Sequence, residues 1–232
     1  MTRLRTLLGT EVVWLLGFLA LVLIGFGVFA PRFLSAANFG SIAFQLPELG
    51  LLTLAMLIPI ISGGLNLAII FTANMAGLTL AWILNVNGGV DAGIGAFVLG
   101  TAAALAVGAA AGFVMGIVIA YTGAHPILVS LSMMIFLRGL GEFLTRGGDI
   151  SGFPDFLKPV GHGLVLGIPV PLVLFAVAAF VWHIMLSRTR HGFAVFMIGS
   201  NIEAARYSGI HVKRTITVLY TLSGLMCAIA GI

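Results

Sequence analysis

Two ionisable side chains, Arg138 and Glu142, lie in the long apolar run that begins at Pro126. Their spacing of four residues places both on one face of a helix, where they can form an ion pair. Ionisable groups inside a membrane span are costly, so they face a partner or a water-filled cavity. The pair is therefore either part of a polar pathway or a structural ion pair near an interface, where long side chains reach water.

A second polar feature, Ser62-Gly63-Gly64-Leu65-Asn66, interrupts the apolar runs 48–62 and 65–84. The first run is shorter than the roughly 20 residues that a membrane-spanning helix needs. A short span broken by Gly or Pro indicates a transport pathway, because irregular backbone at membrane depth must line a cavity or lie inside protein. The alternative is a tight cytoplasmic turn. Candidate pathway residues are Gly63, Gly64, Asn66, Arg138 and Glu142.

The longest polar stretch near the end of the chain is residues 187–214, which holds five of the eleven Lys and Arg residues. Ser200 and Glu203 have the spacing of a capping box, which predicts the start of a short helix. Gly209, a residue that readily adopts the left-handed backbone conformation, predicts the C-terminal end of this helix. This basic, capped segment is either a docking site for another protein or an ordinary loop whose charge sets membrane orientation.

Several chemistries are missing from the sequence. It has no phosphate-binding G-x-x-x-x-G-K-[ST] motif, so the chain is not expected to hydrolyse ATP. The five His residues are scattered and Cys227 is alone, so no zinc site is expected. No G-x-S-x-G motif occurs, and we assign no catalytic residues and no cofactor. Basic residues lie in short loops, which disfavours nucleic acid as a partner.

Composition places the chain in lipid. Its 232 residues are 60% hydrophobic and 8% charged, with a mean hydropathy of +1.19, whereas soluble domains are about 25% charged. The predicted fold class is an all-α polytopic membrane protein with about seven transmembrane helices, forming a single domain over residues 1–232. The predicted runs are 12–30, 48–62, 65–84, 92–121, a fifth from Pro126, 168–186 and 215–232. Longer loops are expected at 31–47 and 146–167.

Loop charges predict the orientation, since Lys and Arg beside short loops favour the cytoplasm. A cytoplasmic N-terminus places seven basic residues inside: Arg3, Arg5, Arg188, Arg190, Arg206, Lys213 and Arg214. Three lie outside: Arg32, Arg146 and Lys158. In the fourth run, small residues recur every four positions and predict a close helix contact. They are Gly100, Ala104, Gly108, Gly112 and Gly116.

Three stretches, 63–67, 125–154 and 188–212, together resemble the permease subunits of bacterial ATP-binding-cassette importers of the ribose and xylose branch. The resemblance implies a multi-pass inner-membrane protein that moves a small solute, best guessed as a monosaccharide, by alternating access. Residues 187–214 would then be the coupling loop that docks on a separate ATPase subunit, which binds the ATP. The residues that match this part of the family pattern are Gly199, Asn201, Glu203, Ala204, Ala205, Ser208, Gly209 and Ile210.

The resemblance also implies a second permease subunit, identical or not, and a periplasmic solute-binding protein that meets loops 31–47 and 146–167. Asn66 stands where the family usually has Asp, and Glu142 stands where it is usually apolar. Family members continue through further spans, so a chain truncated at its C-terminus is expected. The alternatives are an ATP-independent secondary transporter or channel, or a non-functional truncated permease. The sequence leaves open whether run 48–62 crosses fully or re-enters.

Overall fold

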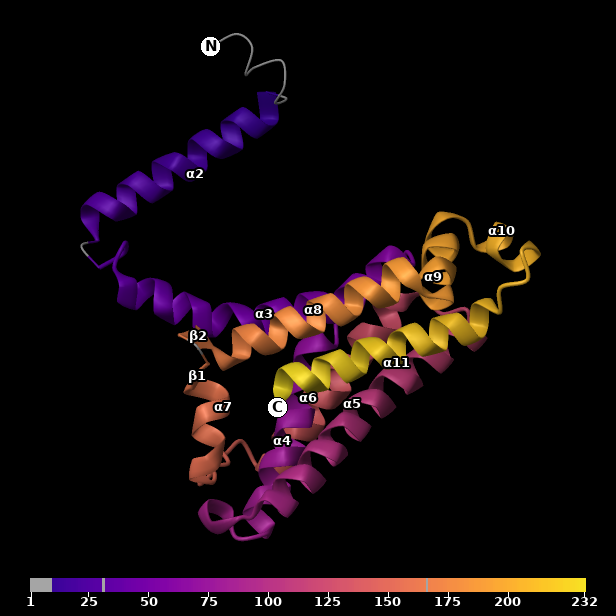
Figure 1. Ribbon diagram of the computed structural model, residues 1–232. Helices are drawn as coiled ribbons and strands as arrows, with labels where there is room; N and C mark the ends of the chain where they lie inside the picture. Colours follow the sequence, from indigo (N-terminus) through magenta and orange to yellow (C-terminus); the bar gives the residue numbers. More distant parts are fainter. Residues whose placement is uncertain (1–9, 31, 166) are drawn as a thin grey trace. The chain divides into compact units, whose positions relative to one another are not determined.

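The computed structural model describes residues 10–30, 32–165 and 167–232 (Figure 1). Its internal contacts define two compact units, Met1–Gln45 and Leu46–Ile232, with the division inside helix α3. Arg3 and Arg5, on which the orientation prediction partly rests, lie outside the described residues. The domain prediction of one unit over the whole chain stays a prediction.

The first unit contains helix α2 (Thr10–Phe29) and the beginning of α3 (Ala36–Ile61). Ser35 starts α3, because its Oγ accepts the amide of Asn38 at 3.3 Å and so satisfies one free amide of the first turn. The Asn38 side chain in turn donates to the carbonyl of Phe33 at 2.7 Å. The predicted loop 31–47 is therefore wrong from Ala36 onward.

The second unit holds the rest of α3 and all later elements. Its longer helices are α4 (Ile69–Val86), α5 (Ile94–Thr122), α6 (Pro126–Thr145), α8 (Val170–Arg188), α9 (Arg190–Ser200) and α11 (Val212–Gly231). Its short elements are η1 (Gly89–Asp91), η2 (Asp155–Leu157), α7 (Lys158–His162), β1 (Leu164–Val165), β2 (Ile168–Pro169) and α10 (Ile202–Tyr207). The two strands pair antiparallel, with Val165 opposite Ile168.

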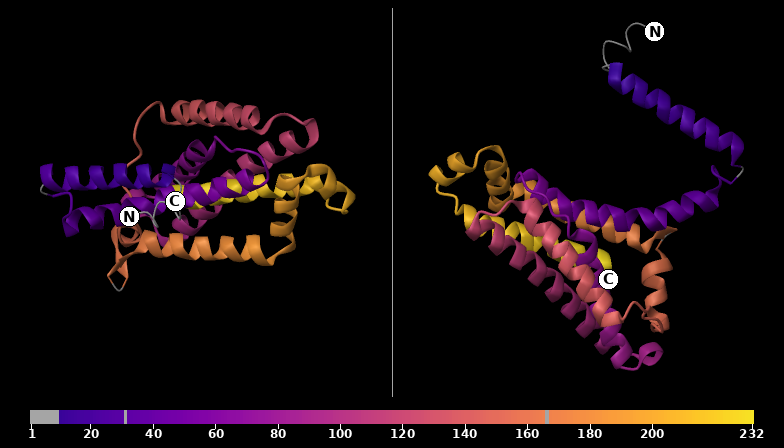
Figure 2. Two further views of the ribbon diagram at one scale, coloured as in Figure 1. Left: turned by 90° about the horizontal axis from the view of Figure 1, so that it is seen from above. Right: turned by 180° about the vertical axis from the view of Figure 1, so that it is seen from behind.

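Helices α4, α5 and α11 pack on one another, although α11 lies far from the other two in sequence (Figures 1 and 2). The predicted ridge of small residues makes this packing possible. A Cβ on Gly112 would overlap the carbonyl oxygen of Tyr220, and a Cβ on Gly116 would lie 2.8 Å from the Cα of Thr217. Gly108 and Gly224 face each other in the same way. The predicted close contact is confirmed, and its main partner is α11.

Helix α8 lies beside the second-unit part of α3 (Figure 1). The Trp182 ring nitrogen donates to the carbonyl of Leu54 at 3.0 Å, and Gly50 leaves room for the ring of Phe175. Before α8, the predicted loop 146–167 carries η2, α7 and the first strand. At its surface Lys158 donates to Asp155 at 2.7 Å, and this hydrogen bond holds the pKa of the carboxyl below its usual value.

Among the residues that the structure describes, seven helices are long and apolar enough to cross a membrane: α2, α3, α4, α5, α6, α8 and α11. The predicted number and the all-α class are confirmed. The second predicted run was too short because polar residues and Pro47 obscure its beginning, whereas α3 has 26 residues. A helix of that length is sufficient to cross fully.

Replacing Gly112 by Ala should destabilise the protein, because the added methyl group would push α5 away from the Tyr220 carbonyl. We expect a loss of about 1–3 kcal/mol, measured as a lower midpoint of thermal unfolding in detergent. Gly139→Ala is the matched control, since a Cβ at this helical glycine meets nothing within 4 Å. It should leave stability unchanged or raise it by up to about 1 kcal/mol. Equal midpoints for the two variants would contradict the tight α5–α11 contact.

Candidate functional site

The interruption at residues 62–68 separates α3 from α4 and contains a left-handed glycine, Gly63. Gly63 has φ +84°, a value that suits glycine because it has no Cβ. The amide of Gly64 donates to the carbonyl of Pro59 at 2.8 Å, and that of Gly63 to Ile60 at 3.0 Å. These two bonds form a Schellman end to α3 and satisfy carbonyls that the helix would otherwise leave free.

Asn66 ties this interruption to two other helices. Its side chain is fully buried; its Oδ1 accepts the amide of Ala68 at 3.0 Å and its Nδ2 donates to Ser223 Oγ at 2.9 Å. The Ser223 hydroxyl donates to the carbonyl of Ala55, in α3, at 2.7 Å. Asn66 therefore holds the interrupted backbone in place from a buried position. No local sequence pattern pointed to Ser223.

Tyr220 adds a further tie between α11 and the interruption. Its hydroxyl donates to the carbonyl of Leu65 at 3.3 Å. A Cβ on Gly64 would lie 2.6 Å from the same hydroxyl, so glycine is the residue that leaves space for it. Gly63, Gly64 and Asn66 thus act together as a structural unit, while the predicted role in a pathway stays a prediction.

Arg138 and Glu142 form the ion pair that their spacing predicts. Arg138 Nε donates to Glu142 Oε1 at 2.9 Å, and each side chain is 63% exposed. The guanidinium also lies 6.0 Å from the ring centroid of Phe71 in α4, within the range of a cation–π contact. The pair therefore lies on the open side of a membrane-spanning helix rather than inside the described bundle. A water-filled space or another subunit would relieve the cost of placing it in lipid.

The polar stretch 187–214 contains two helices, and the sequence predicted one. Helix α9 starts at Thr189, whose Oγ1 accepts the amide of Gly192 at 3.2 Å. It ends against α3, since a Cβ on Gly199 would overlap the carbonyl oxygen of Ile61. Gly199, which matches the family pattern, is therefore a packing residue between α9 and the end of α3.

Helix α10 starts at Asn201, and the predicted Ser200 capping box is wrong. Asn201 Oδ1 accepts the amides of both Glu203 and Ala204 at 3.0 Å, while Ser200 is the last residue of α9. The Glu203 carboxylate accepts from Arg206 at 3.1 Å instead of reaching back to the cap. Both Asn and Ser suit a cap, so only the chain direction at the α9–α10 junction decides between them.

The end of α10 follows the prediction. Gly209 has φ +80°, and the amide of Ile210 donates to the carbonyl of Ala205 at 3.1 Å. Ala205 is fully buried against Ile198 and Val212. This small apolar cluster fixes α10 to α9 and to the start of α11.

Most of the remaining matched residues of the polar stretch 187–214 lie toward solvent. Ala204, Ser208 and Gly209 are exposed, and Ile210 is partly buried. The most open aromatic side chain here is Tyr207, at 89% exposure, which sequence reasoning did not select. With Ile202 it places two large apolar side chains beside the Glu203–Arg206 pair.

Seven candidate membrane spans within the described residues, a tied helix interruption and a capped polar segment between the last two spans indicate a multi-pass membrane protein. Residues 38–232 match the family described as the permease component of the branched-chain amino acid transport system, and the chain belongs to this family.

Curated relatives carry import-permease names. The chain is 30% identical over 228 residues to an autoinducer 2 import system permease protein of Yersinia enterocolitica, covering 94% of this chain and 67% of the relative. It is 30% identical over 207 residues to the ribose import permease protein of Escherichia coli K12, covering 88% and 62%. The chain thus spans about two thirds of the length of such relatives. No solved structure matches it significantly. The apolar spans and these relatives make it a multi-pass protein of the inner membrane.

Asn201→Ala should loosen the first turn of α10, because it leaves the amides of Glu203 and Ala204 without their shared acceptor. The expected change is about 5-fold faster hydrogen exchange at these two amides, since a cap contributes about 1 kcal/mol. Ser200→Ala is the control and should leave their exchange unchanged. If Ser200→Ala accelerates exchange and Asn201→Ala does not, the assignment of the cap is wrong.

Proposed function

We propose that the chain is the permease subunit of an ATP-binding-cassette importer that moves a small polyhydroxylated solute, a monosaccharide, by alternating access. Family membership and the names of the relatives support this proposal. The observation that carries it is α10, a short helix capped at both ends, whose exposed side includes Tyr207. Such a helix suits docking on another protein, because it has little conformational freedom left to lose on binding.

The proposed partner of α10 is a separate ATPase subunit, which binds and hydrolyses the ATP. Tyr207 and Ile202 supply the apolar contact, and the Glu203–Arg206 pair supplies a polar rim. Aromatic side chains surrounded by weaker contacts are the usual anchors of protein interfaces. In this proposal the N-terminus and residues 187–214 lie in the cytoplasm.

Movement of α10 would be transmitted to the membrane-spanning helices through two sets of contacts. The buried cluster of Ile198, Ala205 and Val212 joins it to α9 and α11. Helix α9 meets the end of α3 at Gly199, and α11 meets the interruption through Ser223 and Asn66. Both sets of contacts end at residues 62–68, so a displacement on the cytoplasmic side would shift α3 relative to α4.

We place the solute path along the open face of α6, with Arg138 and Glu142. A guanidinium donates hydrogen bonds and a carboxylate accepts them, which suits hydroxyl groups of either orientation. A second permease subunit would close the opposite side of the path. A periplasmic binding protein would meet the residues between α2 and α3 and those between α6 and α8.

Tyr207→Ala should weaken binding of the proposed ATPase subunit. Loss of an aromatic anchor is expected to weaken affinity by about 30-fold, seen as reduced co-purification from detergent. Tyr207→Phe, which keeps the ring, should co-purify as wild type does. Phe153→Ala removes an exposed aromatic residue before η2 and should have no effect. Undiminished co-purification of Tyr207→Ala would exclude this docking surface.

Arg138→Gln should lower uptake of labelled ribose, tested as the first candidate solute, by about 10-fold, because one charged hydrogen bond contributes about 1.5–3 kcal/mol. ATPase co-purification should be unchanged. Asp91→Asn removes an exposed charge at η1, outside the spans and outside both proposed docking surfaces, and should leave uptake intact.

The rival function, an ATP-independent transporter or channel, gives a different result in the same cells. Uptake through an importer stops when ATP is depleted, whereas uptake through a channel persists. Persistent uptake that still depends on Arg138 would support the rival function and overturn the role proposed for α10.

A further inference from the structure

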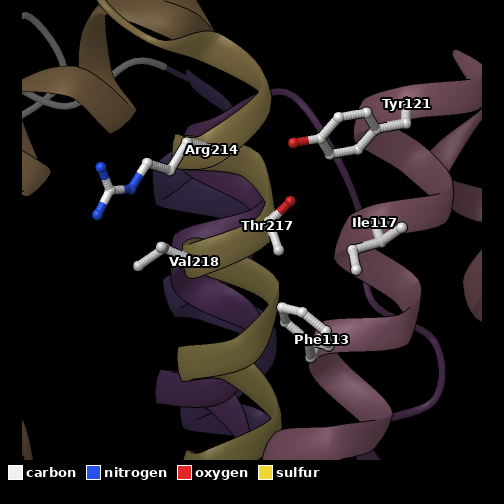
Figure 3. Close-up of a pocket in the computed structure, with 6 residues that line it drawn as sticks. All are labelled: Phe113, Ile117, Tyr121, Arg214, Thr217 and Val218. Carbon is white, nitrogen blue, oxygen red and sulfur yellow. The ribbon is translucent and has the colours of Figure 1, made fainter.

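An open groove of about 400 Å³ runs between α5 and α11, near the end of α5 and the beginning of α11 (Figure 3). Its lining residues are Phe113, Ile117, Tyr121, Arg214, Thr217 and Val218. Tyr121 and Arg214 lie at one end and Phe113 at the other, so the groove changes from polar to apolar along its length. Arg214 lines the groove, and its guanidinium points to the side of α11 away from Tyr121.

The close α5–α11 contact explains the shape of this groove. Gly112 and Gly116 bring the two backbones together, so larger side chains can stand only beside the contact. Phe113, Ile117 and Tyr121 follow one another at intervals of four residues and form one wall. Eight residues of helix rise by about 12 Å, which is the length of a substantial part of a lipid acyl chain.

The polar end of the groove carries positive charge. Lys213 Nζ lies 5.1 Å from the ring centroid of Tyr121, and Arg214 is the next residue in the sequence. Within the part of the chain that the structure describes, the ion pairs are Arg138–Glu142, Lys158–Asp155 and Arg206–Glu203. Neither Lys213 nor Arg214 is paired with a carboxylate there, so both are available to an external anion.

We propose that this groove binds an anionic phospholipid, with the phosphate at Lys213 and Arg214 and an acyl chain against Phe113 and Ile117. Basic residues at the end of a span attract anionic head groups, and tyrosine favours the depth of the head groups. The apolar wall and the charged end match the two parts of one lipid molecule. A second copy of the chain would bring the same positive charges to the groove, so charge complementarity favours the lipid. This proposal does not depend on transport.

The test uses the purified full-length chain, depleted of lipid and titrated with phosphatidylglycerol or phosphatidylcholine under native mass spectrometry. Wild type should prefer phosphatidylglycerol. The double variant Lys213→Gln/Arg214→Gln should bind phosphatidylglycerol about 30-fold more weakly and lose this preference. The control Arg188→Gln/Arg190→Gln removes the same charge from exposed positions outside the groove and should bind as wild type does.

Two further arms distinguish the possible occupants. Ile117→Trp fills the apolar part and should weaken binding of both lipids, while excess inorganic phosphate should not displace phosphatidylglycerol from wild type. Displacement by inorganic phosphate would show a simple phosphate site and overturn the proposal. Retained preference in Lys213→Gln/Arg214→Gln would also overturn it, as would disulfide cross-linking between two copies of the Ile117→Cys variant in membranes.

Discussion

Buried polar groups must find partners within the protein, and the interruption at residues 62–68 meets this constraint through bonds to distant helices. The chain of bonds from Ala68 through Asn66 and Ser223 to Ala55 satisfies groups from three separate elements. Without α11, the side-chain amide of Asn66 would lose its acceptor and the carbonyl of Leu65 would lose its donor. The position of α3 relative to α4 therefore depends on Ser223 in α11, which lies 157 residues after Asn66 in the sequence.

The glycine contact between α5 and α11 holds in place the helix that supplies Ser223 and Tyr220. Gly108, Gly112 and Gly116 let the two helices meet backbone to backbone, which fixes the depth at which Ser223 and Tyr220 stand. In lipid, where apolar side chains gain little by meeting one another, such close approach is a main source of helix association. Because the two backbones are so close, the larger side chains of α5 lie beside the contact. There Phe113, Ile117 and Tyr121 form one wall of the α5–α11 groove.

The polar stretch 187–214 is held rigid by three local features: two helix caps and one left-handed glycine. Thr189 caps α9, Asn201 caps α10, and Gly209 closes α10 with a Schellman turn. Two short helices joined in this way would fray in isolation, but Ala205 and Gly199 anchor them to the bundle. The exposed Tyr207 thus stands on a supported element.

The sequence by itself determined the apolar spans, the small-residue ridge, the Arg138–Glu142 pair and the glycine end of α10, because each depends on composition or on contacts within one helix. It did not predict the start of α3, helix α9 or the cap at Asn201, since several residues there have the right chemistry and chain direction selects among them. Only the tertiary structure decided that Asn66 is a buried tie while Arg138 and Glu142 lie open. Burial depends on which distant helix packs alongside, and Ser223 and Tyr220 give no local signal that they are Asn66's and Leu65's partners.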